Sequence, residues 1–563
     1  MRRLFGARRK PPIAVAAAVV SAASIAWGVS WHRRRQTRRG RVEFEHAPLD
    51  SAVAPGSTGA RDVRFWGRSP EPGAHELTLF EAARDEAGER ALATLPFEVP
   101  KDGGGDGTWT LDYPGDTPGA EPLKPTTAYR FTVRQVAAGR ELGSGRFETA
   151  PEGVDDTPER VTFAVMSCHL PFDAYGMLSD RACRLLEVLP DALEEHGVKR
   201  VMMIGDQMYG DYPPSCSLFN AEYFARVAPP GRASVLDCDR AEIRALYQQR
   251  HRIFWKHPAF AELMARFPCH LILDDHEIVD NFGTSVEHSE PAYDNLRQGA
   301  LDAFYDYQAA RSLRREHDRR PDAFYQSFAY GSVAAFLMDL RSERRADAER
   351  IDVCSERQWQ ALADFLGQNR DRHVLLLALS VPLLHVPDWL ATTGMLLSDS
   401  DGDIADRWTN PKMAATRDRL LHIIHEHQRQ NPHQRLVMLG GDVHVGAVSR
   451  FAWSDEARDT YQLIASALSN REGFLVRNLV ELVPHIGAVV GHDGNADFEG
   501  QLLAPGPECQ SDDVPCNPYG KLNVGLIEVE RQPAGESSVR LKLLGCSDDG
   551  PPRAKVMFDS GRL

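Results

Sequence analysis

The sequence predicts an α/β domain that is preceded by a small all-β domain. Beyond residue 160, short apolar runs alternate with helical segments, which is the pattern of a largely parallel sheet covered by helices. Before residue 150, short alternating segments are separated by Gly, Pro and Asp clusters, as in a β-sandwich. The 563 residues exceed one ordinary domain, so two or three domains are expected.

The composition is that of a globular protein with an acidic balance. Hydrophobic residues make up 42% and charged residues 26% of the chain, which excludes a disordered protein. The formal net charge of −15 argues against nucleic acid as the main partner. It suits a site rich in carboxylates that bound cations would partly neutralise.

The N-terminal region, residues 1–40, is predicted to be a signal peptide or a transmembrane anchor. Residues 13–31 carry no charge, are long enough to cross a bilayer and have arginines on both sides. Arg2-Arg3-Leu4-Phe5 resembles the start of a twin-arginine export signal. Either alternative predicts an exported protein, periplasmic, secreted or at the cell surface, with membrane contact through residues 13–31 if they are not cleaved.

The nine cysteines are compatible with an oxidising compartment. Cys509 and Cys516 are close together in a loop rich in Pro, Asp and Gly, and they are the favoured disulfide pair. Cys216 and Cys238 are the next candidates, although spacing alone does not determine the pairing.

The all-β domain is expected at residues 58–150, between linkers at residues 40–57 and 151–158. The stretch from Leu123 to Tyr129 resembles the fibronectin type III motif, in which a tyrosine packs at a corner and bonds back to the backbone. A structural role is the default for such a domain. Its strands are expected at residues 63–66, 76–80, 129–133 and 146–149.

In the α/β domain, apolar strands and helices succeed one another along the chain, and the first strand, helix and strand predict a right-handed parallel crossover. Strands are expected at residues 161–166, 201–204, 270–273, 333–338, 374–379, 436–439 and 462–465. Helices are expected at residues 180–195, 241–255, 292–311 and 414–428.

Polar residues of the metal-ligating types follow several of these strands. Carboxyl ends of parallel strands meet at one edge of a sheet, and buried carboxylates without a counter-charge are costly, so convergence there indicates a cation site. The segments are Ser167-Cys168-His169, Gly205-Asp206-Gln207-Met208-Tyr209, Asp274-Asp275-His276-Glu277 and Gly440-Gly441-Asp442-Val443-His444.

Together these motifs resemble a known family. Gly-Asp-x-x-Tyr, Asp-Asp-His-Glu and Gly-Asp-Val-His, in this order, resemble the calcineurin-like metallophosphoesterases and, more narrowly, the alkaline phosphatase D (PhoD-like) family. Residues 337–341 and 406–408, and Asn517-Pro518-Tyr519-Gly520, add to the likeness, which covers residues 160–545. The resemblance implies an αββα sandwich with a binuclear metal site.

The resemblance also implies how the ligands divide between two metals. Asp206 would bridge the metals, and no histidine follows the strand at residues 374–379, where most relatives supply one to the second metal. A thiolate and a phenolate suit Fe³⁺, and an all-oxygen set suits Ca²⁺. The first metal would be held by Cys168, Asp206, Tyr209 and His444, and the second by Asp206, Asp275 and Asp442.

His276 follows Asp275 as the catalytic histidine of the superfamily follows its asparagine. The resemblance therefore implies that His276 protonates the leaving oxygen or steadies the phosphoryl charge. Asn281 and Arg341 are candidate substrate-binding residues, and a surface ion pair would explain Arg341 equally well. Glu277 either orients His276 or forms a plain salt bridge.

Two further residues near these motifs are given no part in the site. His169 is expected to point to the opposite face from Cys168, because neighbouring strand residues alternate. Asp211 matches no family position and is interpreted as loop structure.

The function that the resemblance implies is metal-dependent phosphoester hydrolysis by a hydroxide that bridges two cations. One alternative is a phosphodiesterase that acts on phospholipid or a cell-wall polymer. The other is a non-catalytic, anchored binding or adhesion protein built on a degenerate scaffold. The presence of His276 favours an enzyme, because a degenerate scaffold would be expected to lose it.

Overall fold

The structure is a computed structural model. It describes residues 33–82, 91–101, 105–117, 119–315, 319–383, 405–470, 489–492, 497–507, 509, 516–532, 536–547 and 550–563. The predicted signal or anchor at residues 13–31 lies outside the described residues. Among those that are described, no helix combines the length and the apolar character that crossing a membrane requires.

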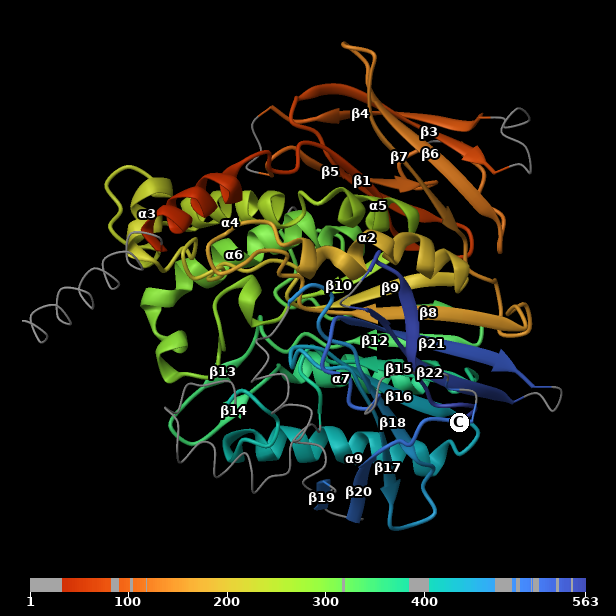
Figure 1. The fold of residues 1–563 in the computed structure, drawn as a ribbon. Helices are drawn as coiled ribbons and strands as arrows, with labels where there is room; N and C mark the ends of the chain where they lie inside the picture. The colour runs from red at the N-terminus through yellow and green to blue at the C-terminus, as the bar shows by residue number, and fades with distance from the viewer. Residues whose placement is uncertain are drawn as a thin grey trace, which may run out of the picture.

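Two mixed sheets form the centre of the molecule (Figure 1). The first has the order β10 (Cys269–Ile272), β9 (Val198–Ile204), β8 (Arg160–Met166), β21 (Asn523–Arg531), β22 (Ser537–Cys546) and β23 (Ala554–Asp559). The second has the order β11 (Gln326–Tyr330), β12 (Val333–Leu337), β15 (Val374–Ala378), β16 (Arg435–Gly440), β18 (Thr460–Ile464), β17 (Ala447–Trp453), β20 (Asp497–Leu502) and β19 (Val489–His492). Parallel pairing joins β8, β9 and β10 in one sheet and β12, β15, β16 and β18 in the other.

Helices cover the outer face of each sheet, which confirms the predicted αββα sandwich (Figure 1). The first sheet is covered by α2 (Asp180–Glu195), α4 (Arg240–Phe254), α5 (Pro258–Arg266) and α6 (Asp294–Tyr307), and the second by α7 (Glu356–Gln368) and α9 (Ala414–Gln430). Shorter elements are α3 (Ala221–Val227), the pair β13 (Arg345–Ala346) and β14 (Ile351–Asp352), and 3₁₀ turns at Val235–Asp237, Asp275–Glu277, Val286–Ser289, Pro291–Tyr293, Ala309–Arg311 and Pro411–Met413.

The central strands are apolar throughout because both of their faces are buried. On β8, Phe163 and Val165 pack between the two sheets, whereas Ala164 and Met166 pack under the helices. On β9, Met202 and Met203 divide in the same way. Successive side chains thus point to opposite faces, and both faces are apolar. The strand sequence is therefore a continuous apolar run, as expected for parallel strands covered on both sides.

The N-terminal domain is a sandwich of two antiparallel sheets (Figure 1, red to orange). One sheet holds β1 (Ala52–Thr58), β2 (Val63–Arg68) and β5 (Thr108–Tyr113), and the other holds β4 (Ala91–Val99), β3 (Gly73–Glu81), β6 (Ala128–Gln135) and β7 (Arg140–Glu148). The Tyr129 hydroxyl accepts a hydrogen bond from the Lys124 N–H at 2.9 Å, which is the predicted tyrosine corner.

The two ends of the fold differ from the predictions. Residues 40–57 are not a linker, because residues 33–45 include a helix and Ala52–Thr58 forms β1. β1 contains Pro55 and Gly56, which are unusual inside strands, so its sequence does not match the pattern expected of a strand. At the other end, the first sheet continues through β23 to Asp559, beyond the predicted limit at residue 545.

The predicted disulfide bonds are not present among the described residues. Cys216 and Cys238 are free thiols, and each lies near a backbone carbonyl oxygen, of Tyr175 at 3.7 Å and of Ser234 at 3.8 Å. Cys509 is also a free thiol, so the predicted bond to Cys516 is wrong as well.

Candidate metal centre

The first set of predicted ligands comes together around Asp206, at the carboxyl ends of β8, β9 and β16. Asp206 Oδ2 accepts hydrogen bonds from the Cys168 thiol and the Tyr209 hydroxyl, both at 3.3 Å. Ligand atoms of Cys168, Asp206 and His444 lie within 4.8 Å of one another. The structure therefore brings together all the residues that the sequence assigned to the first metal.

Asp206 also belongs to a second group, which is made of carboxylates alone. Oxygens of Asp206, Asp274, Asp275 and Asp442 lie within 4.8 Å of one another. Within the described part of the chain, Asp206 Oδ1 and Asp275 Oδ1 are buried without a hydrogen-bond partner. Burial, reinforced by Asp275 and Asp274, raises the pKa of Asp206 well above its usual value. Clustered buried oxygens of this kind fit a hard cation, which would satisfy them.

The backbone of the candidate ligands is strained. Cys168, Asp206, Asp442 and His444 have φ values of 59°, 60°, 62° and 55°. Side chains other than glycine rarely adopt this region, at a cost of about 1–3 kcal/mol each, and such residues cluster at functional sites. Gly205 lets the loops approach each other, because a Cβ there would lie 2.5 Å from the Asp274 Cβ.

His276 is held by Asp211, which the sequence had left without a role. Asp211 Oδ1 lies 2.8 Å from His276 Nδ1, and Asp211 Oδ2 accepts a hydrogen bond from the Asp280 N–H at 2.7 Å. Burial lowers the pKa of His276, but Asp211, Asp275 and Asp206 together raise it well above its usual value. The interpretation of Asp211 as loop structure is therefore wrong. The four residues between Asp206 and Asp211 fold back and bring both carboxylates to the site.

Glu277 supports the backbone of the loops rather than His276. Its carboxylate accepts hydrogen bonds from the N–H groups of Asp206 at 2.9 Å, Gln207 at 2.7 Å and Asp274 at 2.8 Å. Burial raises the pKa of Glu277 to about 7. The prediction that Glu277 orients His276 or forms a plain salt bridge is therefore wrong.

Arg341 lies beneath the site and is fully buried. Its guanidinium donates to Asp274 Oδ1, and it pairs with Asp406 Oδ2 at 2.6 Å. Asp274 Oδ1 also accepts from the Ser380 hydroxyl at 2.9 Å. A side chain with no exposed surface cannot contact a substrate, so the substrate-binding prediction for Arg341 is wrong.

Asn281 and His169 lie where the sequence suggested. The Asn281 N–H donates to Asp275 Oδ2 at 2.5 Å, which places this residue beside the carboxylate group. His169 points away from the site. Its Nε2 is 3.0 Å from the Phe254 carbonyl oxygen, and its Nδ1 is 2.9 Å from Ser469 Oγ.

Three residues at the site were not identified from the sequence as parts of it. Asn470 Nδ2 lies 2.9 Å from His444 Nε2, and the Ser466 hydroxyl lies 3.1 Å from Cys168 Sγ. Arg407 forms an ion pair with Asp442. Residues 406–408 were noted only because they resemble a motif of the family, which gave Arg407 no role. Asn470 and Ser466 belong to no motif, so nothing in the sequence placed them at the site.

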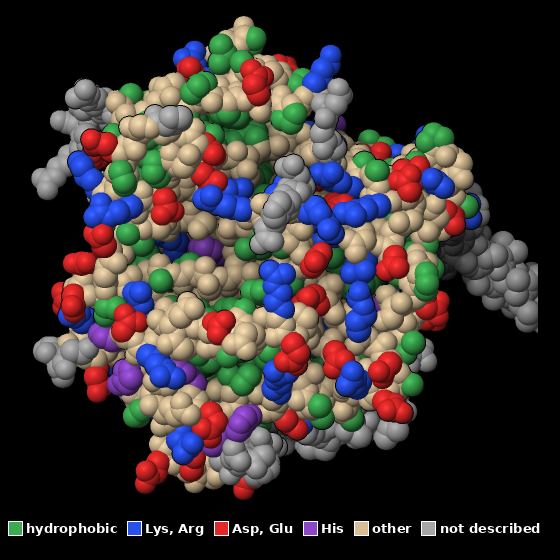
Figure 2. Space-filling model, turned by 180° about the vertical axis from the view of Figure 1, so that it is seen from behind, with side chains coloured by type: hydrophobic (Ala, Val, Ile, Leu, Met, Phe, Trp, Pro, Cys, Tyr) green, Lys and Arg blue, Asp and Glu red, His purple; other side chains and the backbone are tan. Residues whose placement is uncertain are grey.

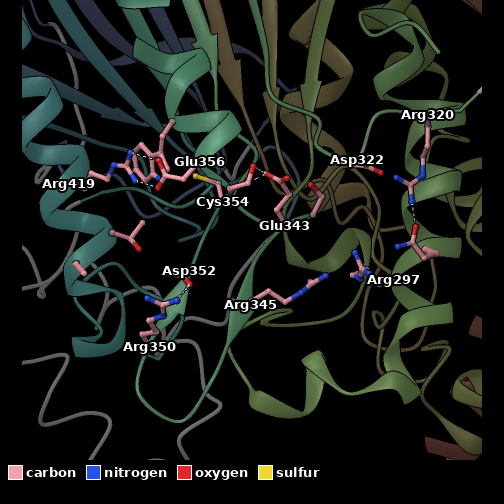
Figure 3. Close-up of a pocket in the computed structure, with 16 residues that line it drawn as sticks. Arg297, Arg320, Asp322, Glu343, Arg345, Arg350, Asp352, Cys354, Glu356 and Arg419 are labelled. Carbon is pink, nitrogen blue, oxygen red and sulfur yellow. Dashed lines mark hydrogen bonds and ion pairs between the residues drawn. The ribbon is translucent and has the colours of Figure 1, made fainter. Parts of the chain in front are cut away.

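A separate charged cavity of about 830 Å³ lies near α6, α7, α9 and the β13–β14 pair (Figure 3). We call it the arginine pocket; its charged lining residues are Arg297, Arg320, Asp322, Glu343, Arg345, Arg350, Asp352, Glu356 and Arg419. Many of these charges have a partner. Arg350 pairs with Asp352 at 3.1 Å, Arg419 pairs with Glu356 at 2.8 Å, and Glu343 accepts from the Ser355 hydroxyl at 2.7 Å.

Comparison with known proteins assigns the family. The sequence profile described as "PhoD-like phosphatase" matches residues 164–472, which is more than half of the chain and contains every candidate ligand. This chain belongs to the PhoD-like phosphatase family. The resemblance seen in the sequence motifs is thereby confirmed.

Individual relatives of this PhoD-like chain are distant in sequence. "Alkaline phosphatase D" of Bacillus subtilis (strain 168) is 26% identical over 238 residues, which are 40% of this chain and 35% of that protein. The match thus spans about a third of the curated relative. A solved structure, "Structure of PhoD", superimposes with a TM-score of 0.60 at 15% identity and covers 90% of this chain and 88% of that one. This second likeness supports the fold.

Proposed function

We propose that this chain hydrolyses phosphoesters, as an alkaline phosphatase or phosphodiesterase, on a binuclear metal centre outside the cytoplasm. The observation that carries the proposal is the group of Asp206, Asp274, Asp275 and Asp442, whose oxygens crowd together within 4.8 Å in a PhoD-like chain. Export through residues 1–40, or anchoring through residues 13–31, is part of the same proposal.

The ligand types support two unlike cations. Cys168, Asp206, Tyr209 and His444 would hold Fe³⁺, because thiolate and phenolate favour a transition metal. Asp206, Asp275 and Asp442 would hold Ca²⁺, which prefers oxygen ligands. When bound, the cations would activate water as the nucleophile and offset charge on the phosphoryl group.

The remaining polar residues divide into those that act on the substrate and those that position other groups. His276, oriented by Asp211, would protonate the leaving alkoxide from its Nε2. Arg407 and Asn281, beside Asp442 and Asp275, would bind the phosphoryl oxygens.

The charge distribution on one face of the molecule argues against nucleic acid as the main partner. On the face shown in Figure 2, acidic and basic side chains are interspersed and do not form one basic tract. Nucleic-acid binding as a main function would require a concentrated positive surface.

The decisive experiment compares two variants of the full chain. Asp206→Asn is expected to lose bound metal and activity together, measured by elemental analysis and by hydrolysis of nitrophenyl phosphate and bis(nitrophenyl) phosphate. His276→Asn is expected to keep its metals and lose turnover by about 10²–10⁴-fold. His425→Asn, a buried histidine on α9 that pairs with Asp455, is the matched control and keeps activity.

Two outcomes would contradict the proposal. Equal hydrolysis by the wild type and by Asp206→Asn would exclude catalysis at this centre and favour a binding protein on a degenerate scaffold. Zinc in place of iron and calcium in the purified protein would overturn the division of the ligands.

A further inference from the structure

The end of helix α4 connects three parts of the chain: the N-terminal helix at residues 33–45, the β-sandwich, and the loop that carries Asp206 and Tyr209. Two consecutive residues, Phe254 and Trp255, make the connection, and both are fully buried.

Phe254 lies between the N-terminal helix and Tyr209. Its ring is stacked on the Tyr209 ring at 5.8 Å and 21° and meets the edge of the Phe44 ring at 6.0 Å and 86°. Phe44 is itself fully buried. A displacement of Phe44 would therefore leave space behind the ring that supports a candidate metal ligand.

The N-terminal helix is fixed to the α/β domain by polar contacts as well. Arg41 Nε donates to the Ser215 carbonyl oxygen at 2.7 Å, and Lys256 Nζ donates to the Glu43 carbonyl oxygen at 2.8 Å. Gly40 packs so closely that a Cβ would lie 1.9 Å from the Tyr175 carbonyl oxygen. The helix is thus part of the folded domain and not a tether.

Trp255 connects the sandwich to the residue after Asp206. Its Nε1–H donates to the Gln207 carbonyl oxygen at 3.0 Å, and its ring lies 6.2 Å from the Trp66 ring of β2. The Arg311 guanidinium lies 4.0 Å from the centre of the Trp66 ring and 5.3 Å from that of Trp255.

Arg311 is held by these aromatic contacts more than by hydrogen bonds. It is fully buried, and within the part of the chain that the structure describes its Nη atoms have no hydrogen-bond partner. Burial lowers the pKa of Arg311 to about 10, so the side chain is still charged at neutral pH. A desolvated cation beside two indole rings is a strong and directional contact.

Two residues on one face of β2 contact the segment around this cation, and Gly56 of β1 packs against the backbone of Arg311. Trp66 Nε1–H donates to the Asp306 carbonyl oxygen at 2.7 Å, and Arg64 Nε donates to the Ala310 carbonyl oxygen at 2.6 Å. The neighbouring Phe65 points the other way, into the core of the sandwich, because successive side chains on a strand alternate.

We propose that the N-terminal helix and the β-sandwich are positioning parts of the metal centre, which act through Phe254 and Trp255 on Tyr209 and Gln207. Phe44, Trp66 and Arg311 are then positioning residues, because none of them touches the site directly. The inference rests on the proposed metal centre. It assigns the sandwich a role beyond that of a structural module, since a small shift of Asp206 or Tyr209 would change the ligand geometry.

The test uses the matched pair Trp66→Leu and Phe65→Leu in the full chain. Two quantities are measured: hydrogen exchange of the peptide covering residues 205–211 in metal-free protein, and metal affinity by titration with elemental analysis. Trp66→Leu is expected to speed exchange in this peptide and to weaken metal binding by about 10-fold or more. Phe65→Leu is expected to lower the unfolding midpoint while leaving both quantities unchanged.

A second pair tests the helix. Phe44→Ala is expected to speed exchange in the same peptide, whereas Val42→Ala, at an exposed position of the same helix, is expected to leave it unchanged. If Trp66→Leu does not fold, Arg311→Lys replaces it, because lysine keeps the charge and loses the flat contact with the indole rings. Trp66→Phe is expected to restore part of the loss.

Wild-type exchange and wild-type metal affinity in Phe44→Ala and in Trp66→Leu, or in its replacement Arg311→Lys, would overturn the inference. An equal effect of Phe65→Leu would overturn it too, since general destabilisation would then explain the result. The proposed function fails separately. A wild-type protein that binds metals and hydrolyses no phosphoester would refute catalysis, and the exchange measurements would still decide the positioning role.

Discussion

The candidate metal centre and the arginine pocket both gather charged side chains, but they differ in burial and in pairing. In the arginine pocket, Arg350 and Asp352 form a pair while their side chains remain 67% and 49% exposed. In the metal centre, Asp206 is 1% and Asp275 is 3% exposed, and each has an oxygen without a hydrogen-bond partner among the described residues.

This difference in burial and pairing distinguishes a candidate cation site from a cluster of ordinary surface ion pairs. Exposed pairs form in water at little cost and have little effect on stability. Burying a carboxylate without a counter-charge lowers the stability of the fold by roughly several kcal/mol, unless a cation or an arginine compensates it. Asp274 pairs closely with Arg341, and Asp275 lies 3.8 Å from the same guanidinium, whereas Asp206 has no arginine partner among the described residues. The oxygens of Asp206 and Asp275 that lack hydrogen bonds fit a cation.

The largest effect is expected on removing the buried counter-charge. Arg341→Met would leave Asp274 without its counter-charge, while Asp406 would keep its pair with Arg344, and would lower the free energy of unfolding by about 3–5 kcal/mol. Urea unfolding measures the change. Arg350→Met in the arginine pocket is the matched control, and a loss there as large as that at Arg341 would refute the contrast between the two regions.

The next effect concerns turnover alone. Asp211→Asn would keep the metals but lower kcat by about 10–100-fold, because the orientation of His276 depends on this carboxylate. Steady-state kinetics and elemental analysis check both parts. Asp280→Asn, whose carboxylate is 3.8 Å from His276 and half exposed, should change kcat little. An Asp211→Asn enzyme with wild-type kcat would show that the contact has no role in catalysis.

A moderate effect is expected from buried histidines that remain neutral. Burial lowers the pKa of His251 to about 4 and that of His270 to about 3. In the unfolded chain these groups bind protons from about pH 6.5 downward. The stability that they contribute is therefore complete above about pH 6.5 and falls as the pH decreases, by up to about 1.4 kcal/mol per pH unit for each histidine.

Unfolding of the wild type and of His270→Gln at pH 6.5, 5.5 and 5.0 would test this prediction. The variant is expected to show the smaller slope. Equal slopes for the two proteins would contradict the assignment to His270.

The smallest effect is expected in the arginine pocket itself. Asp352→Asn should change the free energy of unfolding by about 0.5 kcal/mol or less, because its pair with Arg350 is solvated. The remaining effect should fade as salt is added. A change of several kcal/mol at any ionic strength would show that the pair is structurally required.

Much of the candidate site could be predicted from the sequence because strand ends carry a strong local signal. A buried apolar run, a glycine and then a carboxylate pointed to Asp206, and the same logic pointed to the segments that contain Cys168, Asp275, Asp442 and His444. The family resemblance then selected these residues within the segments. Parallel strands place their carboxyl ends at one edge, so residues far apart in sequence were predicted to meet. The structure brings these residues together.

Other contacts depended on how loops fold back, which local patterns do not specify. Asp211 reaches His276 only because its loop reverses, and Arg341 is buried because Asp274 and Asp406 surround it. The position of Arg341 just after a strand is equally compatible with an exposed arginine, so the sequence did not predict its burial.

The sequence alone determined the α/β class and the edge of the sheets at which the candidate metal ligands lie, because periodicity and strand ends are local features. The αββα sandwich was implied by the resemblance of the motifs to a known family. The tertiary structure alone decided which side chains support those ligands. Phe44, Trp66 and Arg311 come from separate segments and meet at Phe254 and Trp255 only after the chain has packed. Contacts between distant segments depend on packing that no single stretch of sequence contains.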